Sequence, residues 1–172
     1  MSATSFGEAT GVHALCDAYV DSYARLNPLA ATEFGIGGHD DRLPDLSPEG
    51  HQARAELARG ALAAMAEAEP VDEGERIAKA VFRERTGIEA EMHEAGLPAA
   101  SLNMIASPVQ DIRWVFDLMP TATADDWAAI AKRLAQVPQT LAGYRASLLA
   151  SADKGLLPAA RQVRRAREQC AT

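Results

Sequence analysis

Apolar side chains recur at steps of three and four residues along most of this chain, a spacing typical of amphipathic helices. Over residues 10–26 the apolar positions are Val12, Leu15, Tyr19, Tyr23 and Leu26. This pattern predicts a first helix over residues 10–26 with one buried stripe. Asn27-Pro28 ends it, and residues 28–34 can form a short further turn of helix.

Two long helices are expected next, with a proline between them. The first spans residues 48–68, is built mostly of Ala, Glu, Arg and Leu, and is stopped by Pro70. The second spans residues 72–95, and its period predicts that four apolar side chains point inward: Ile77, Val81, Ile88 and Met92. The glutamates and arginines between them indicate a solvated or cleft-lining face.

The second half of the chain continues the helical period after an irregular, fairly apolar segment over residues 96–108. One helix begins at Ser107-Pro108, ends at Pro120, and carries Val109, Ile112, Phe116 and Met119 on one face. Thr123 and Asp126 have the spacing of a capping box. A long stripe follows, with Trp127, Ile130, Leu134, Val137, Leu141, Tyr144 and Leu148. Pro138 breaks or kinks this helix, which is expected to reach about residue 153.

The last expected helix, over residues 158–170, has little apolar surface. Val163 is its one large aliphatic residue, and the side chains around it are Arg161, Arg164, Arg165 and Arg167. Such a helix gains little by packing on its own domain, so we expect it to be frayed or to meet a partner. It lacks the bulky apolar face of a membrane-surface or calmodulin-binding helix.

A single long interruption, Gly35–Ser47, divides the first helices from the rest. Its glycines allow sharp turns, Pro44 excludes helix, and Ser47-Pro48 is a good helix start. It holds the densest group of side chains able to do chemistry: His39, Asp40, Asp41, Arg42 and Asp45. They could titrate or ligate a metal. We favour aspartates in turns that pair with Arg42, because sequence neighbours seldom converge on one ion.

Composition supports a single all-α domain over residues 1–172. Hydrophobic residues make up 48% of the chain but aromatic residues only 5%, and the alanine-rich remainder favours helix. A formal charge of −7 argues against nucleic acid or an anionic membrane as the main partner. No apolar run reaches the roughly 20 residues of a transmembrane helix. With no signal-peptide pattern at the start, and reduced thiols expected for Cys16 and Cys170, we expect a cytoplasmic protein.

Composition and spacing reveal no complete catalytic or metal-binding motif. His93-Glu94 matches the start of the His-Glu-x-x-His motif of zinc peptidases, but the second histidine would fall at Leu97. Without a second histidine at that spacing, one helix face cannot present two zinc ligands. We therefore predict no catalytic, cofactor-binding or metal-binding residue in this chain.

Several segments of the chain resemble the bacterial domain of unknown function 885 family. The resemblance begins at Asn27-Pro28, Ala31-Thr32 and Gly35, and continues through His39, Asp41, Leu43, Asp45, Leu46 and Ser47. Residues 103–110, 115–120, 143–145 and 161–163 are similar to a subgroup of the same family. One departure is that Asp41 lies one residue nearer to His39 than in the commonest family pattern.

The resemblance implies an irregular multi-helix bundle that is the N-terminal part of a larger fold similar to gluzincin-type metallopeptidases. In such proteins a His-Glu-x-x-Pro-Gly-His motif and a later acidic residue would hold a catalytic zinc and act on peptide-like substrates. That motif is absent from residues 1–172. The chain is then expected to be inactive alone, with the C-terminal catalytic region as a candidate partner. By analogy, His39, Asp41 and Arg42 are the candidates to face the substrate cleft.

Two alternatives to a peptidase segment remain open at this point. The chain could be a stand-alone helical interaction module that binds through its basic last helix or the loop around His39. It could also be a truncated product without activity. Whether the chain belongs to an enzyme is therefore undecided from the residues alone, and the sequence after residue 172 would discriminate most cheaply.

Overall fold

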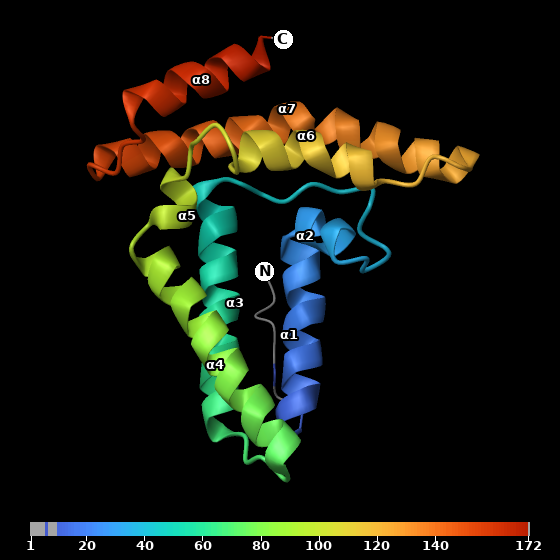
Figure 1. Cartoon of the computed structure of the whole chain (residues 1–172), viewed down its shortest axis with the longest axis vertical. Helices are drawn as coiled ribbons and strands as arrows, with labels where there is room; N and C mark the ends of the chain where they lie inside the picture. Colours follow the sequence, from blue (N-terminus) through green and yellow to red (C-terminus); the bar gives the residue numbers. More distant parts are fainter. Residues whose placement is uncertain (1–5, 7–9, 172) are drawn as a thin grey trace.

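The computed structural model describes Phe6 and residues 10–171, in which the regular structure is helical and includes no strand (Figure 1). This confirms the predicted all-α fold. The helices are α1 (Val12–Leu26), α2 (Pro28–Glu33), α3 (Pro48–Glu67), α4 (Glu73–Glu94), α5 (Leu97–Ala100), α6 (Pro108–Leu118), α7 (Ala124–Asp153) and α8 (Ala160–Cys170). None of these helices combines the length and apolar character needed to cross a membrane.

Helix starts follow the local signals in the sequence. The Ser47 hydroxyl accepts a hydrogen bond from the Gly50 N–H at 3.2 Å, and Pro48 occupies the first turn of α3. Thr123 and Asp126 form the predicted capping box, since each side chain accepts a hydrogen bond from the other's backbone N–H. These caps explain why α3 and α7 begin at the predicted positions.

The helices form two layers (Figure 1). α3 packs against both α1 and α4, and these three helices run along the long axis of the molecule. α6 and α7 pack on each other and lie across one end of the three, where α2 contacts α6 and α5 contacts α7. α8 lies beyond them and carries the C-terminal end.

Two small apolar clusters form the core among the described residues. Val12, Leu15 and Met65 form the cluster between α1 and α3. Leu46, Ile112 and Tyr144 form the second, which joins the 34–47 loop to α6 and α7. Gly143 allows this second contact, because a Cβ atom there would lie 3.0 Å from the backbone nitrogen of Ser47.

The prediction that α4 points its large apolar side chains inward is wrong. Its four predicted core residues are each 43–55% exposed: Ile77, Val81, Ile88 and Met92. α4 instead contributes Ala78 and Phe82 to the α1–α3 cluster and buries Glu75 and Thr86. A different stripe of α4 therefore packs on the helices, while Ile88 and Met92 of the predicted stripe line a cleft.

The stripe predicted for α7 is buried only in part. Tyr144 is buried and Val137 and Leu148 pack near it, whereas Trp127, Leu134 and Leu141 are exposed. Polar side chains occupy much of the buried face: Arg133, Thr140, Ser147 and Ser151. The Ser147 hydroxyl, for example, donates to the Leu46 carbonyl at 2.7 Å. Backbone carbonyls of the loop therefore replace apolar contacts along this face.

α7 also continues through Pro138, so the predicted alternative of a break is wrong. Pro138 lacks the N–H that would bond the Leu134 carbonyl, but both residues are exposed and water can solvate that oxygen. One 30-residue helix can therefore span the whole end of the molecule.

α8 is a formed helix joined to the body by polar contacts. Its single buried residue among those described is Ala166. The Gln162 side chain accepts from the Met104 N–H at 3.1 Å, and the Gln110 amide donates to Gln169 at 2.8 Å. These glutamine contacts explain how a helix with so little apolar surface is held in place.

Candidate functional site

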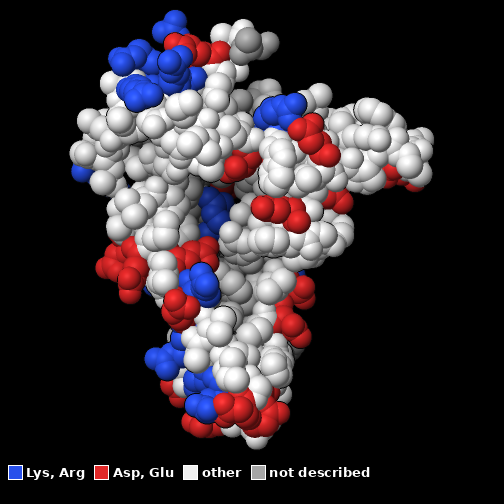
Figure 2. Space-filling model, viewed as in Figure 1, with Lys and Arg blue, Asp and Glu red and all other residues white. Residues whose placement is uncertain are grey.

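A cleft of about 640 Å³ opens where α1, α2, α3, α4 and α6 meet. Figure 2 shows a hollow in this face with basic atoms at its centre and acidic atoms around it. One part of the wall is apolar, with Leu29, Ile88, Met92, Trp114, Val115 and Leu118. The polar lining comprises Tyr23, Asn27, Glu33, His51, Arg54, Arg85, Glu89, His93, Ser101, Ser107 and Asp111. The exposed residues of α4, Ile88 and Met92, thus have a role as cleft wall.

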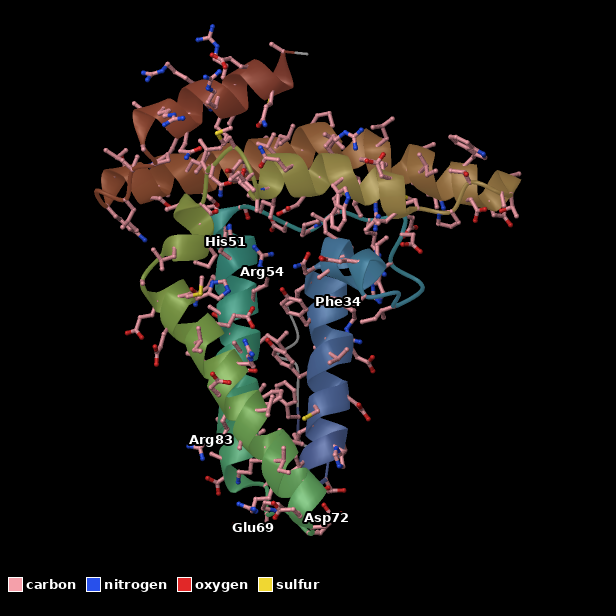
Figure 3. All side chains as sticks on the ribbon, viewed as in Figure 1. Phe34, His51, Arg54, Glu69, Asp72 and Arg83 are labelled. Atoms are coloured by element: carbon pink, nitrogen blue, oxygen red, sulfur yellow. The ribbon has the colours of Figure 1, made fainter. Side chains whose placement is uncertain are left out.

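Arg54 is the buried cation of this cleft. It extends from α3 toward the side on which Phe34 lies (Figure 3), and only 8% of its surface is exposed. Its Nη1 donates to the Asp45 carbonyl at 2.8 Å and its Nη2 donates to Nδ1 of His51 at 3.1 Å. Among the described residues no carboxylate comes within the 4.0 Å of an ion pair with Arg54. Burial lowers the pKa of its guanidinium.

His51 lies one turn before Arg54 on the same face of α3, which places the two side chains side by side. An arginine can only donate, so Nδ1 of His51 accepts and its proton lies on Nε2. That Nε2 is buried and has no hydrogen-bond partner. Burial, then the charge of Arg54, then His93 lower the pKa of His51 to about 4. His51 is therefore a neutral N–H donor at pH 7.

The remaining polar groups of the cleft come from α1, α2, α4, α6 and the segments between helices. The Tyr19 hydroxyl donates to Glu89 at 2.8 Å, and this contact links α1 to α4. The Asn27 amide donates to the Tyr23 hydroxyl at 3.1 Å. Burial also lowers the pKa of His93, whose ring centroid lies 6.3 Å from that of His51. The cleft thus pairs a buried positive charge with carboxylates nearer its mouth.

This arrangement can bind an anion, but the described residues do not fit a zinc ion. Nowhere in residues 10–171 or at Phe6 do three or more His, Cys, Asp and Glu side chains gather closely enough to hold a metal. His51 contacts the Arg54 guanidinium, and the charge of Arg54 also acts on His93, so a cation at these histidines would be repelled. We therefore derive no step through a metal from these residues.

The sequence-predicted candidates His39, Asp41 and Arg42 lie together in the α2–α3 loop, against α7. Arg42 donates to Nδ1 of His39 at 3.0 Å and lies 3.6 Å from the Asp41 carboxylate. The Arg42–Asp41 ion pair, together with the turn in which Asp45 Oδ1 accepts from the Ser47 N–H at 2.8 Å, agrees with the contacts that we favoured for the loop. Neither of the two described pockets is lined by these three residues. Their place at a substrate cleft stays a prediction.

Sequence reasoning missed His51 and Arg54, although a signal was present. Arg54 shares one helix face with Ala58, Ala61 and Met65, which are buried. A charged residue at a position of a buried stripe needs a polar partner or a ligand. The sequence prediction gave residues 48–68 as a helix built mostly of Ala, Glu, Arg and Leu and singled out no position in it, because arginine is common on solvated helix faces.

Comparison with known proteins identifies one family. The family model described as "Bacterial protein of unknown function (DUF885)" matches residues 28–172, a range that includes His51, Arg54 and the whole of α3–α8. No curated protein matches the chain.

Proposed function

The chain belongs to the DUF885 family of bacterial proteins of unknown function, and from this premise we propose that it is the N-terminal helical segment of a zinc-dependent peptidase or related hydrolase. On this proposal the chain has no hydrolytic activity alone, and the catalytic groups belong to a C-terminal region. The substrate of the whole protein would be peptide-like, and the cleft of this segment would form one wall of the substrate site.

The observation that carries the proposal is the apolar surface on two helices. On α4, Ile77 and Val81 are about half exposed, and on α7 the exposed side chains include Trp127 and Leu134. Large exposed apolar residues that recur along a helix face commonly mark a surface that another chain or segment covers. A further catalytic region would bury these faces, which supports the interpretation as a segment.

The ligands of a zinc ion would have to come from that further region. The sequence of residues 1–172 has no His-Glu-x-x-Pro-Gly-His motif, and its His93-Glu94 pair lacks a histidine at Leu97. Burial lowers the pKa of His93; the charge of Glu89 opposes this, and the charge of Arg54 adds to the lowering. The proposal therefore assigns no metal ligand to this chain.

Two measurements test the proposal. The first is the coding sequence after codon 172, in which we expect a His-Glu-x-x-Pro-Gly-His motif. The second is the zinc content and peptide hydrolysis of the purified 172-residue chain, in which we expect neither stoichiometric zinc nor turnover. A coding region that continues without any metal-binding motif would refute the peptidase assignment. Stoichiometric zinc with turnover would refute inactivity of the isolated chain.

A specific observation favours a second candidate, a helical interaction module. Figure 2 shows a cluster of basic side chains on α8, at the end of the molecule beyond α7. The arginines of α8 are exposed: Arg161, Arg164, Arg165 and Arg167. They would suit an acidic protein surface. A coding region that stops at residue 172 would favour this module over the peptidase segment.

A further inference from the structure

We propose that the cleft around Arg54 binds the carboxylate of an apolar monocarboxylate ligand, with the Nε2–H of His51 as a second donor. The ligand class follows from the charges and walls of the cleft and does not depend on the peptidase assignment. Its carboxylate would meet the guanidinium at the cleft floor, and its apolar body would lie against the wall formed by Ile88, Met92 and Trp114.

The first argument is the missing counterion of Arg54. Its two hydrogen bonds, to the Asp45 carbonyl and to His51, use two of its five N–H donors. Both acceptors are uncharged, and a buried cation is costly unless an anion pairs with it. Asp45 and Glu89 lie near enough to favour its charged form, yet neither forms an ion pair with it. A ligand carboxylate would supply the missing partner in bidentate form.

The second argument is the unsatisfied donor of His51. This side chain is 9% exposed and lines both this cleft and the smaller neighbouring pocket, and its buried Nε2 has no partner. Buried polar atoms in folded proteins almost always have a hydrogen-bond partner. Because Nδ1 is already occupied by Arg54, Nε2 keeps its proton and can only donate. A ligand oxygen is an acceptor of the required kind.

The third argument concerns which anion the cleft would accept. Glu33, Glu89 and Asp111 also line it, and burial followed by the charge of Glu33 raises the pKa of Asp111. The lining also holds Arg85, but this arginine is exposed and pairs with Glu84, so Arg54 is the buried cation among these carboxylates. Carboxylates around one buried arginine disfavour dianions such as phosphate and dicarboxylates. The apolar side chains of the wall, Leu29, Ile88 and Trp114 among them, give a purely polar anion little to contact. A monocarboxylate with an apolar body satisfies both conditions.

Isothermal titration calorimetry of the folded chain with two matched pairs of probes tests the proposal. 4-Phenylbutyrate represents a free carboxylic acid, and N-acetyl-Leu-Phe represents a peptide C-terminus. The C-terminal amide of each probe has the same apolar body without the charge, and inorganic phosphate tests a polar dianion. We expect at least one acid to bind. The chain should bind such an acid at least about tenfold more tightly than it binds the matching amide, and at least about tenfold more tightly than it binds phosphate. The tighter of the two acids identifies the source of the carboxylate.

Substitutions then locate the site. Arg54→Met keeps the length and apolar stem of the side chain and should weaken acid binding at least about tenfold while leaving amide binding unchanged. His51→Gln should weaken acid binding by a smaller factor. Arg59→Met is the matched control, since Arg59 is exposed on the same helix and lines neither pocket. The Arg59→Met variant should bind both acids with the affinity of the unsubstituted chain.

The proposal fails if neither acid binds, if each acid binds no better than its amide, or if phosphate binds more tightly than both acids. It also fails if Arg54→Met keeps full acid affinity. The comparison of acid with amide uses only the unsubstituted chain, so it decides the matter even if Arg54→Met does not fold. Failure of acid binding would leave the zinc-motif test of the proposed function unaffected, which keeps the two outcomes separate.

Discussion

The buried guanidinium of Arg133 donates a hydrogen bond from Nε to the backbone carbonyl of Arg42, at 2.9 Å. Its Nη2 donates to the His39 carbonyl and to the Thr32 hydroxyl, each at 2.9 Å. Arg133 comes from α7 and is fully buried, and Asp40 lies 3.9 Å from it. One side chain in the second half of the chain therefore fixes the loop that separates α2 from α3.

Replacing Arg133 should destabilise the fold strongly. Arg133→Met leaves loop carbonyls without donors in a buried site, which we expect to cost about 3 kcal/mol of unfolding free energy. Urea denaturation followed by circular dichroism measures this loss. Lys132→Met is the matched control, because Lys132 is exposed and its nitrogen lies 4.0 Å from Asp41. It should change stability by less than about 0.5 kcal/mol, and equal losses in the two variants would contradict the role of Arg133.

The contacts of Arg133 show which features of the fold can be predicted from the sequence and which cannot. Helix positions and caps follow from neighbours within four residues, so Ser47, Thr123 and Pro120 located them correctly. The buried face of α7 does not follow from nearby residues, because Arg133 and Ser147 pair with backbone carbonyls some hundred positions earlier in the chain. Hydrophobic periodicity counts such residues as solvated, and it assigned the exposed Leu134 to the stripe instead.

The candidate site was harder to predict than the fold for a similar reason. The loop residues His39 and Arg42 stood out because they are adjacent in sequence, whereas the cleft gathers Tyr23, Arg54 and Glu89 from three helices. Their proximity depends on how α1 and α4 pack on α3. That packing is set by small side chains such as Ala58 and Ala61, which give almost no periodic signal.

The correction for α4 can be checked with a matched pair of isoleucines. Ile112 is 4% exposed in the cluster with Leu46 and Tyr144, whereas Ile77 is 55% exposed on α4. We expect Ile112→Ala to lower the unfolding free energy by about 3 kcal/mol and Ile77→Ala by less than about 1 kcal/mol. Urea denaturation of the two variants tests this. A larger loss for Ile77→Ala would restore the inward-facing α4 of the sequence prediction.

The start of α3 depends on a position without a side chain. A Cβ atom at Gly50 would lie 2.1 Å from the Asp45 carbonyl oxygen, the same carbonyl that accepts from Arg54. Gly50→Ala should therefore force the backbone apart and cost about 3 kcal/mol in thermal or urea unfolding. Gly87→Ala is the control within a helix, where no atom comes within 4 Å of the added Cβ.

Because alanine has the higher helix propensity, Gly87→Ala should stabilise the protein by up to about 1 kcal/mol. Opposite signs for the two glycine variants are thus expected, and a neutral Gly50→Ala would mean that the approach of the loop to α3 is looser than the structure describes. Acid-binding calorimetry on a folded Gly50→Ala protein would also report any shift of Arg54.

The stability of the protein should fall as the pH is lowered from about 6.5 to about 4, in part through His51. Burial, the charge of Arg54 and the nearby His93 hold the pKa of His51 near 4 in the folded state, against an ordinary value of about 6.5. Between these two pKa values His51 is protonated in the unfolded chain but neutral in the folded chain, so lowering the pH favours unfolding. The full contribution is about 3 kcal/mol, present above pH 6.5 and lost by pH 4.

Urea denaturation at pH 7.5, 6.0, 5.0 and 4.0 measures this dependence. His51→Gln removes the titrating group, so its unfolding free energy should fall less steeply with decreasing pH than that of the parent chain. His13→Gln replaces an exposed histidine of α1 and should keep the parent's dependence. Parallel curves for the parent and His51→Gln would contradict a neutral, buried His51. Parallel curves would also argue against an unsatisfied Nε2–H donor on His51, because a solvated imidazole donates that hydrogen bond to water.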